Sequence, residues 1–263
     1  MGRIEALTSP ANPLLKDVRR AISRGGLTEQ GYLVAETFHL LEEALRSDLD
    51  VKVILAAESV QSSVRAQVGR LAGIRLAIVD DAVFQKLADT ESSQGVITLA
   101  NPPAWTLEQT LRGQTLAVVL DGVQDPGNAG SIVRAAEAFG ATGVLFTKGT
   151  VGAFNAKTLR ASAGSLFRVP FVQGVDVTLA RAALQQQSSA IYTAIPHGGQ
   201  MLPTVDLRRK CALVIGNEAH GIGEGWRAGS TGISIPSAGV ESLNASVAAG
   251  ILLYEAQRQR SRS

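Results

Sequence analysis

The sequence predicts an α/β protein with two parts: a small N-terminal α/β domain and a larger C-terminal domain built on a parallel β-sheet. Three observations support this fold class. Short apolar runs alternate with amphipathic helical patterns along most of the 263 residues. In the C-terminal half these runs are continuously apolar, as in strands that are buried on both faces of a parallel sheet. Two adjacent prolines, Pro102 and Pro103, interrupt the pattern between the two halves.

The N-terminal domain is expected over residues 1–100. The segment GYLVAETFHLLEEAL, residues 31–45, indicates a short strand that leads into a helix, because apolar residues recur at helical spacing from Phe38 onward. KVILAA and RLAIV, residues 52–57 and 75–79, indicate two further strands. Residues 101–115 are the expected linker, since the two prolines stop any regular element there.

The C-terminal domain is expected over residues 116–263, with strands and helices in alternation. Five strands are predicted, at TLAVVLD, GVLF, AIYTAI, CALVIGN and GISIP, which are residues 115–121, 143–146, 190–195, 211–217 and 232–236. The helix after the first strand buries one apolar side, formed by Ala129, Ile132, Val133 and Ala136. A second helix is expected over residues 176–187. The last helix starts near Asn244, and its expected buried side comprises Val247, Ala248, Ile251 and Leu252.

Composition limits the possible classes of protein. A 45% content of hydrophobic residues with 18% charged residues is typical of a globular protein with a sizeable core. No apolar run approaches the roughly 18 residues of a membrane helix, and no secretory signal is recognised, so we expect a cytoplasmic protein without a membrane partner. Cys211 is the single cysteine and lies in an apparent strand, which leaves no disulfide and no cysteine-based zinc site. No metal is expected.

Charge is distributed unevenly along the chain. Residues 1–24 hold five Lys or Arg and two acidic residues, a net charge of +3. Residues 25–100 hold six basic and eleven acidic residues (−5), and the remainder holds fourteen and ten (+4). The basic N-terminal segment and the basic C-terminal half suit a polyanion such as nucleic acid, although solvated surface charge is the alternative.

The first motif is DPGNAGSIVRAAEAFG, residues 125–140. Asp125 to Asn128 have the composition of a turn, and they lead into a helix start, whose free N–H groups attract anions. Arg134 lies off the apolar side of this helix, one turn beyond Gly130, where it is able to point back toward Asn128. The alternative is a surface residue that pairs with Glu137, three positions on.

The second motif is VIGNEAHGIGEG, residues 214–225. Gly216, Asn217 and Glu218 follow a predicted strand, and ligands of open α/β sheets bind at such strand ends. The later glycines do not form a dinucleotide fingerprint, because they do not lie directly between a strand and a helix. His220 is interpreted as a loop histidine, since no second metal ligand follows at a useful spacing.

The third motif begins at ISIP, residues 233–236, where a predicted strand ends at Pro236. A loop of small residues follows, and Ser242 or Asn244 caps the last helix. A well-capped terminal helix alone would account for this motif. It does not account for polar residues at a third strand-to-helix junction, after those at Asn128 and Glu218.

These three motifs, in this order, resemble the SpoU (TrmH) RNA ribose methyltransferases of the SPOUT superfamily. The resemblance covers about residues 116–260 and rests on Asn128-x-Gly130-x-x-x-Arg134, Gly216-Asn217-Glu218-x-x-Gly221, and Ile235-Pro236 followed by Ser242-Leu243-Asn244-x-Ser246. The N-terminal part resembles, less specifically, the L30e-like substrate-binding domain of such enzymes, in NPLLK and YLVAE. Thr37 stands where that domain commonly has glycine, and Ser237 stands where methionine is common after Ile235-Pro236.

The resemblance implies a catalytic domain with a deep trefoil knot, a homodimer, and S-adenosylmethionine-dependent methylation of a ribose 2′-hydroxyl in structured RNA. Ribosomal RNA is the expected substrate, and a transfer RNA ribose methyltransferase and a non-catalytic RNA-binding module are the alternatives. The non-catalytic module would be expected to lack Arg134 or Asn244, and both are present. A Rossmann-type nucleotide enzyme is disfavoured, because TLAVVLDGVQDPGNAG contains no G-x-G-x-x-G.

The resemblance also assigns residues to roles. Gly216, Ile235 and Leu243, and in addition Thr193 and Asn217, are expected to bind the cofactor, mostly through backbone groups. Arg134 is expected to bind a substrate phosphate and to contact the ribose hydroxyl; a free guanidinium, with a pKa above about 12, is a poor base. Asn128, Glu218 and Asn244 are expected to orient Arg134 and the ribose.

Overall fold

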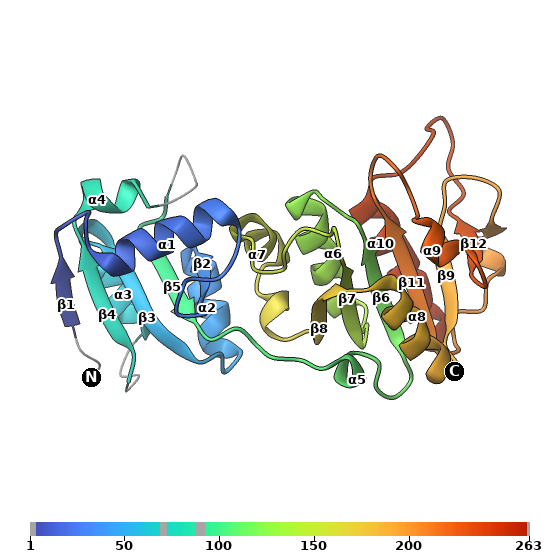
Figure 1. Cartoon of the computed structure of the whole chain (residues 1–263), viewed down its shortest axis with the longest axis horizontal. Coiled ribbons are helices and arrows are strands. Elements are labelled where there is room, and N and C mark those ends of the chain that lie inside the picture. The colour runs from blue at the N-terminus through green and yellow to red at the C-terminus, as the bar shows by residue number, and fades with distance from the viewer. Residues whose placement is uncertain (1–3, 69–72, 88–92, 262–263) are drawn as a thin grey trace. The chain divides into compact units, whose positions relative to one another are not determined.

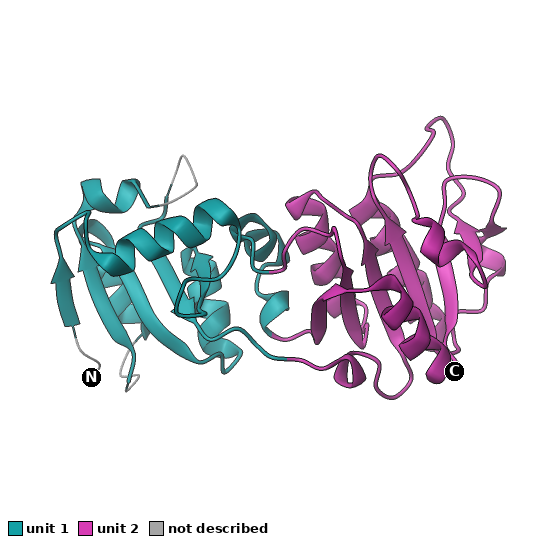
Figure 2. Cartoon of the chain, in the orientation of Figure 1, with its two compact units in different colours: residues 1–104, 154–167 teal, residues 105–153, 168–263 magenta. Residues whose placement is uncertain are grey.

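The structure is a computed structural model that describes residues 4–68, 73–87 and 93–261. The chain forms two compact units, which are coloured separately in Figure 2. Unit 1 comprises residues 1–104 and 154–167, and unit 2 comprises residues 105–153 and 168–263. Within the described residues, no helix is long and apolar enough to cross a membrane.

Unit 1 is a mixed five-stranded sheet with the strand order β1-β4-β3-β5-β2 (Figure 1). Its strands are β1 (Ile4–Leu7), β2 (Leu33–Glu36), β3 (Val51–Ala57), β4 (Arg75–Val79) and β5 (Val96–Ala100). Its helices are α1 (Pro13–Arg24), α2 (Phe38–Arg46), α3 (Gln61–Val68), α4 (Asp81–Gln85) and α7 (Ala156–Ser162). The predicted strands at residues 52–57 and 75–79 are β3 and β4, which pair in parallel. The elements β1, α1 and β5 were not predicted from the sequence.

Helix α7 belongs to unit 1, although its residues were predicted to lie in the C-terminal domain, residues 116–263. The carboxylate of Glu36, buried at the end of β2, forms an ion pair with the guanidinium of Arg160 on α7. Gly164, just after α7, passes close to α2: a Cβ atom there would lie 2.6 Å from the Cβ of Glu43. A buried carboxylate requires a charged partner, and this partner lies 124 residues further along the chain.

The structure explains why glycine suits the position of Thr37. Thr37 precedes α2 with a φ of 106°, a conformation that side chains with a Cβ rarely adopt. Its hydroxyl accepts a hydrogen bond from the Leu40 N–H (3.2 Å) and thereby caps α2. A capping hydrogen bond therefore accompanies an unfavourable backbone conformation at this residue.

Unit 2 is a seven-stranded, entirely parallel sheet with the order β10-β12-β9-β11-β6-β7-β8, as predicted for its class. Its strands are β6 (Leu116–Asp121), β7 (Gly143–Thr147), β8 (Phe171–Val175), β9 (Ala190–Ala194), β10 (Gln200–Met201), β11 (Cys211–Gly216) and β12 (Thr231–Ser234). Its helices are α5 (Leu107–Thr110), α6 (Pro126–Ala138), α8 (Val177–Gln186), α9 (Glu224–Arg227) and α10 (Ala245–Arg260). The five predicted strands are present. Two further strands, β8 and β10, were not predicted. They lie at the sheet edges, and their exposed residues leave no continuous apolar run in the sequence.

Helices cover the sheet of unit 2. Ala180 and Leu184 of α8 share a core cluster with Val119 of β6 and with the buried Trp226 of α9. Val118, next to Val119, is also fully buried and points to the opposite face of the strand. Helices α6 and α10 pack against each other, and α10 also contacts β11.

The buried side of α10 differs from the predicted one. Its buried residues are Ala249, Leu252, Leu253 and Ala256. Val247 and Ile251, which were expected to be buried, are 50% and 36% exposed. Apolar residues occur on more than one side of this helix, so helical spacing alone does not identify the side that packs against its own chain.

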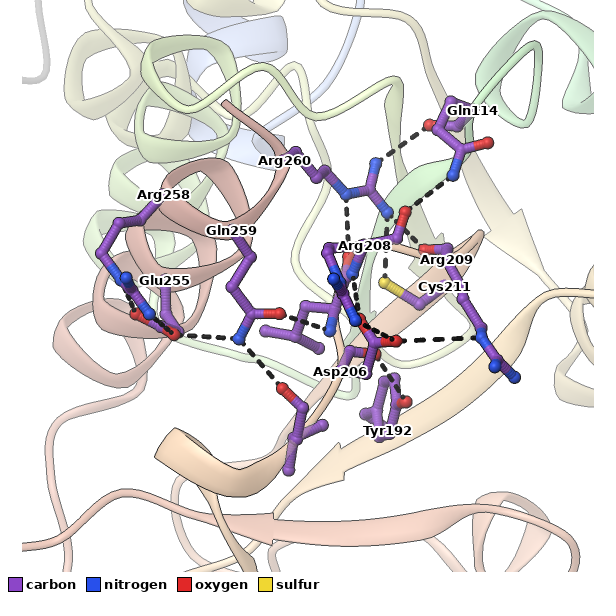
Figure 3. Close-up of polar contacts among 12 residues, drawn as sticks. Gln114, Tyr192, Asp206, Arg208, Arg209, Cys211, Glu255, Arg258, Gln259 and Arg260 are labelled. Atoms are coloured by element: carbon purple, nitrogen blue, oxygen red, sulfur yellow. Dashed lines mark hydrogen bonds and ion pairs between the residues drawn. The ribbon is translucent and has the colours of Figure 1, made fainter. Parts of the chain in front are cut away.

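The last turn of α10 is anchored by Arg260 (Figure 3). Its guanidinium donates hydrogen bonds to four backbone carbonyls, those of Leu207 (2.9 Å), Gln114 (3.0 Å), Thr115 (3.0 Å) and Arg209 (2.6 Å). It also approaches the sulfur of Cys211 (3.5 Å). Burial raises the pKa of the Cys211 thiol to about 11, even though the nearby Arg260 lowers it. One side chain thus ties the end of α10 to the segments that precede β6 and β11.

Replacing Arg260 should destabilise unit 2. Arg260→Ala leaves several carbonyls without their donor, and we expect the free energy of unfolding in urea to fall by about 2 to 4 kcal/mol. Arg258→Ala is the matched control, because Arg258 is 39% exposed and, among the described residues, pairs only with Glu255 of the same helix. Its free energy of unfolding should fall by much less. Equal losses from the two variants would contradict the anchoring role of Arg260.

Candidate functional site

The candidate site lies at the carboxyl ends of the central strands of unit 2. Strands β6, β9, β11 and β12 are parallel, so the loops that follow them emerge at the same edge of the sheet. The loop after β11 and the loop after β12 both line a cavity of about 550 Å³ at this edge. Such a volume suits a ligand the size of a nucleoside cofactor.

Most of the predicted site residues line this cavity. They are Gly216, Asn217, Glu218, Ile235, Leu243 and Asn244. Further apolar lining comes from Ile195, Ile215 and Ile233, and polar lining from His220, Glu241 and Ser242. The cavity therefore combines an apolar wall with a few polar groups, as small-molecule sites commonly do.

Thr193 does not line the cavity, in contrast to the expectation from the sequence. It is buried within β9, and the lining comes instead from Ala194 at the end of the strand and from Ile195 and Pro196 beyond it. The cavity lies at the carboxyl end of β9, and Thr193 is one residue short of that end. The rule that ligands bind at strand ends would have selected residues 194–196.

Gly216, the last residue of β11, allows the following loop to fold back onto the strand. A Cβ atom at Gly216 would lie 2.5 Å from the backbone carbon and oxygen of Gly221. The loop is closed by two backbone hydrogen bonds between Asn217 and Gly221, of 3.0 and 2.9 Å. No side chain fits at residue 216 while this loop keeps its shape.

Asn217 lies at the cavity, but its side chain is used to hold the loops together. Its amide donates to the Gly122 carbonyl (2.7 Å), and its oxygen accepts from the N–H groups of Ala219 (2.9 Å) and His220 (3.0 Å). We therefore assign its side chain a positioning role in place of direct cofactor binding. Asp121 provides a second link, since its carboxylate accepts from the Gly223 N–H (2.8 Å).

Asp121 was not identified in the sequence as a site residue. It terminates the apolar run of β6 and is buried, and a carboxylate at the end of a buried strand is a signal that could have been used. Together, Asp121 and Asn217 connect the loop after β6 to the loop after β11.

Three predicted residues from three motifs form a continuous hydrogen-bonded chain. The Asn128 amide donates to the Glu218 carboxylate (2.9 Å), and the Asn244 amide donates to the Asn128 oxygen (3.0 Å). The Asn244 oxygen in turn accepts from the N–H groups of Ser246 (2.9 Å) and Val247 (3.3 Å) at the start of α10. Every amide in this chain has one orientation that satisfies both neighbours, so the side chains are held in a fixed arrangement.

Glu218 is the anionic end of this chain. Burial raises the pKa of its carboxyl, but the hydrogen bonds from Asn128 and from neighbouring backbone N–H groups lower it more, so the net pKa lies below the ordinary 4.5. Glu218 is therefore ionised at neutral pH and is a weak base. Its charge is suited to orienting Asn128.

The start of α6 differs from the predicted anion site. The helix begins at Pro126, and Asp125 caps it by accepting a hydrogen bond from the Asn128 N–H (2.6 Å). A carboxylate thus already occupies the place where an external anion would bind. Asn128 lies in the first helical turn and contributes its side chain, not its backbone, to the site.

Arg134 is exposed on α6 and forms no hydrogen bond or ion pair within the part of the chain that the structure describes. The alternative pairing with Glu137 is not formed, because Glu137 binds Arg168 (2.5 and 3.1 Å). Six residues correspond to about 240° of rotation around a helix, so Arg134 and Asn128 lie on different sides of α6. The structure brings Asn128, Glu218 and Asn244 together and does not bring Arg134 into contact with them.

No group of three or more His, Cys, Asp or Glu side chains suited to a metal ion occurs within residues 4–68, 73–87 and 93–261. The polar side chains that line the cavity include the amides of Asn217 and Asn244, the carboxylates of Glu218 and Glu241, and the imidazole of His220. These groups bind and orient uncharged or phosphate-bearing ligands.

Comparisons with known proteins agree with the three motifs. Residues 115–254 match the SpoU rRNA Methylase family, and residues 12–98 match the MRM3-like substrate binding domain. The chain is 32% identical to an uncharacterized tRNA/rRNA methyltransferase of Synechocystis, over 98% of this chain and 95% of that protein. It is 30% identical to the 23S rRNA (guanosine(2553)-2'-O)-methyltransferase RlmP of Bacillus subtilis, over 95% of this chain and 98% of that protein.

Solved structures give the same result. The chain is similar to the SpoU methyltransferase AviRb of Streptomyces viridochromogenes, solved in complex with AdoMet, with a TM-score of 0.85 and 26% identity over 95% of this chain and 98% of that one. It is also similar to an AdoMet-bound rRNA methyltransferase of Sinorhizobium meliloti, with a TM-score of 0.80 and 28% identity over 98% of both chains.

Proposed function

The chain belongs to the SpoU rRNA methylase family, and from this premise we propose that it transfers a methyl group from S-adenosylmethionine to a ribose 2′-hydroxyl of structured RNA. Ribosomal RNA is the proposed substrate, because the relative from Bacillus subtilis carries a 23S rRNA 2′-O-methyltransferase name. The observation that carries the proposal is the cavity at the strand ends together with the polar chain of Glu218, Asn128 and Asn244.

The cavity fits the proposed cofactor. Its apolar wall, with Ile195, Ile215 and Ile233, suits a purine ring, and the loop packed on Gly216 also lines it. We assign Gly216, Ile235 and Leu243 to cofactor binding. When bound there, S-adenosylmethionine supplies a methyl group on a positively charged sulfur, so the protein needs only to align the acceptor and assist the loss of its proton.

The polar chain and Arg134 are proposed to hold the acceptor. Asn128 and Asn244, fixed by Glu218 and by the start of α10, offer amide groups that orient a ribose. Arg134, exposed and without a partner in the described chain, is proposed to bind a substrate phosphate and to contact the 2′-hydroxyl. In this proposal the cavity binds the cofactor, and Arg134 binds the RNA.

The test is methyl transfer from radiolabelled S-adenosylmethionine to protein-free ribosomal RNA and, separately, to bulk transfer RNA. We expect label in ribosomal RNA, at positions that become resistant to alkaline cleavage because the 2′-hydroxyl is blocked. Transfer RNA is the second candidate, since the Synechocystis relative is named a tRNA/rRNA methyltransferase. Label on a base would contradict ribose methylation. No label with either RNA would contradict the proposed function and favour a non-catalytic RNA-binding module.

A homodimer is part of the proposal. Val247, Ile251 and Tyr254 form an exposed apolar stripe along α10, with exposures of 50%, 36% and 55%. The Tyr254 ring also contacts Phe139, the residue after α6, edge to face with 5.8 Å between ring centres. An apolar stripe of this kind suits the self-complementary contact of a twofold dimer.

A negative charge introduced into this apolar stripe should dissociate the dimer. We expect Ile251→Glu to sediment as a monomer at micromolar concentration, since pairing would bury two carboxylates. Leu179→Glu is the matched control: Leu179 is 57% exposed on α8, outside the stripe, and its replacement should leave a dimer. A wild-type chain that is monomeric and active would count against the homodimer.

Further parts of the proposal rest on family membership. We propose that residues 116–263 form the methyltransferase domain with its trefoil knot, that residues 1–100 form the RNA substrate-binding domain, and that residues 101–115 link them. The match of residues 12–98 to a substrate-binding domain supports the second assignment. Residues 154–167 lie in the same compact unit, and we propose that they belong to this domain as well. We also propose a cytoplasmic location, where ribosomal RNA is available.

A further inference from the structure

The exposed side of α1 in unit 1 carries a row of cations. Its members, called here the α1 basic face, are Lys16, Arg19, Arg20 and Arg24. Spacings of three and four residues place them on one side of the helix, over a length of about 12 Å. The opposite side packs into the core of unit 1 through Leu15, Val18, Ala21 and Ile22. The helix is therefore fixed in the domain with its cations facing outward.

Outside α1, four of the seven cations of unit 1 that the structure describes have acidic partners, and Arg65, Lys86 and Lys157 do not. Ion pairs join Arg46 with Glu42, Lys52 with Asp50, Arg75 with Glu5, and Arg160 with Glu36. On the α1 basic face only Arg20 has such a partner, Glu29. The side chains of Lys16, Arg19 and Arg24 form no ion pair or hydrogen bond within the described residues.

The acidic residue of α1 does not neutralise this face. Asp17 is buried, and its carboxylate accepts two hydrogen bonds from the Glu29 N–H, of 2.9 and 3.1 Å. Unit 1 without the four cations of α1 has nine basic and thirteen acidic residues. Positive charge is thus concentrated on one helix of an otherwise acidic domain, as on surfaces that bind nucleic acid.

The α1 basic face continues onto α7. Gly25, which ends α1 in a left-handed conformation, lies against Asn155, the residue that caps α7: a Cβ atom at Gly25 would be 2.5 Å from the Asn155 side-chain nitrogen. Lys157 follows two residues later, is exposed, and has no ion pair in the described chain. Two distant segments of the sequence therefore contribute cations to one region of unit 1.

We propose that the α1 basic face, extended by Lys157, binds the phosphodiester backbone of the substrate RNA outside the nucleotide that is methylated. Unpaired Lys and Arg at these spacings match a row of phosphates, and neutralising each phosphate releases a counterion. The inference rests on the proposed function for its choice of RNA as the polyanion. It adds the surface through which unit 1 makes that contact.

The experiment measures binding of the full chain to a fluorescently labelled RNA hairpin of arbitrary sequence, at several salt concentrations. Arbitrary sequence suffices because phosphate contacts carry no sequence information. The test variant is Arg19→Gln/Arg24→Gln, and the matched control is Arg46→Gln/Lys52→Gln, which removes the same charge from exposed but paired positions of unit 1. Calorimetry with S-adenosylmethionine checks that unit 2 is intact in both variants.

We expect the test variant to bind the hairpin about tenfold or more weakly at 0.1 M salt and to show a salt dependence that is shallower by about 1.5 in logarithmic slope. The control variant should bind like the wild type. In methyl transfer the test variant should raise the KM for RNA and leave kcat unchanged.

Equal weakening in the two double variants would overturn the inference, because net charge alone would then explain binding. Unchanged RNA binding by the test variant would also overturn the inference. If that variant instead lost binding to phosphatidylserine vesicles, the α1 basic face would be a membrane-binding surface and not an RNA-binding one. Methyl transfer is scored separately, so an inactive wild type that still shows the expected binding difference would refute the proposed function and leave the α1 basic face supported.

Discussion

Replacing Arg134 with alanine should abolish methyl transfer, with a fall in kcat of at least about 100-fold, and should leave the fold and the affinity for S-adenosylmethionine nearly intact. Arg134 is exposed and has no partner in the described chain, so its removal breaks no contact that stabilises unit 2. It also does not line the cavity proposed for the cofactor. Turnover on ribosomal RNA at saturating cofactor, together with urea unfolding and calorimetry, measures these three properties.

Two further variants separate the possible roles of Arg134. Arg134→Lys keeps the charge but lacks the planar pair of donors, so partial RNA binding with little turnover would indicate that the hydroxyl must be positioned by the guanidinium. Glu137→Ala is the control, because Glu137 pairs with Arg168 and not with Arg134; its turnover should change little. Near-normal turnover by Arg134→Ala would remove this residue from the proposed mechanism.

Gly216→Ala should nearly eliminate cofactor binding, with an affinity for S-adenosylmethionine at least about tenfold lower. The new Cβ would meet backbone atoms of Gly221 at 2.5 Å, and backbone atoms cannot rotate away as the end of a side chain can. The loop at residues 217–221 must therefore move. That movement displaces Asn217, which holds the loop after β6, and Glu218, which orients Asn128.

The control for this substitution is Gly26→Ala, at a glycine with no atom within 4 Å of the added Cβ. It should leave the calorimetric affinity unchanged. If Gly216→Ala binds S-adenosylmethionine like the wild type, the loop packed on Gly216 is not part of the cofactor site. Because Glu218 moves with the loop, turnover should fall more steeply than affinity.

Much of the site could be predicted because each of its motifs is a short, continuous segment of the sequence. Each motif follows an apolar strand, and parallel strands bring their carboxyl ends to one edge of the sheet. The family resemblance implied a shared role for Asn128, Glu218 and Asn244, and these side chains are hydrogen-bonded in a chain. The role of Asn217 was not predictable in the same way. Its amide is committed to the Gly122 carbonyl, a contact between residues 95 positions apart, and no local pattern reports such a contact.

The fold shows the same division between local and distant information. The strands of unit 2 follow from continuous apolar runs, whereas residues 154–167 join unit 1 through contacts with distant segments, among them the pairing of Arg160 with Glu36. The two apolar sides of α10 look alike in sequence. Packing within the chain buries Leu252 and Leu253 and leaves Val247 exposed, and that choice is made by tertiary contacts.

The burial of Cys211 has a practical consequence for observing this protein. A thiol with a pKa of about 11 is ionised in only about one molecule in a thousand at pH 8, and the thiolate is the form that reacts with maleimides and iodoacetamides. Because the chain has no other cysteine, a single cysteine introduced at the exposed Ser23 of α1 would take up one dye per chain without removal of the native one. The arrival and departure of RNA at this helix could then be timed in stopped-flow experiments on an otherwise unaltered sequence.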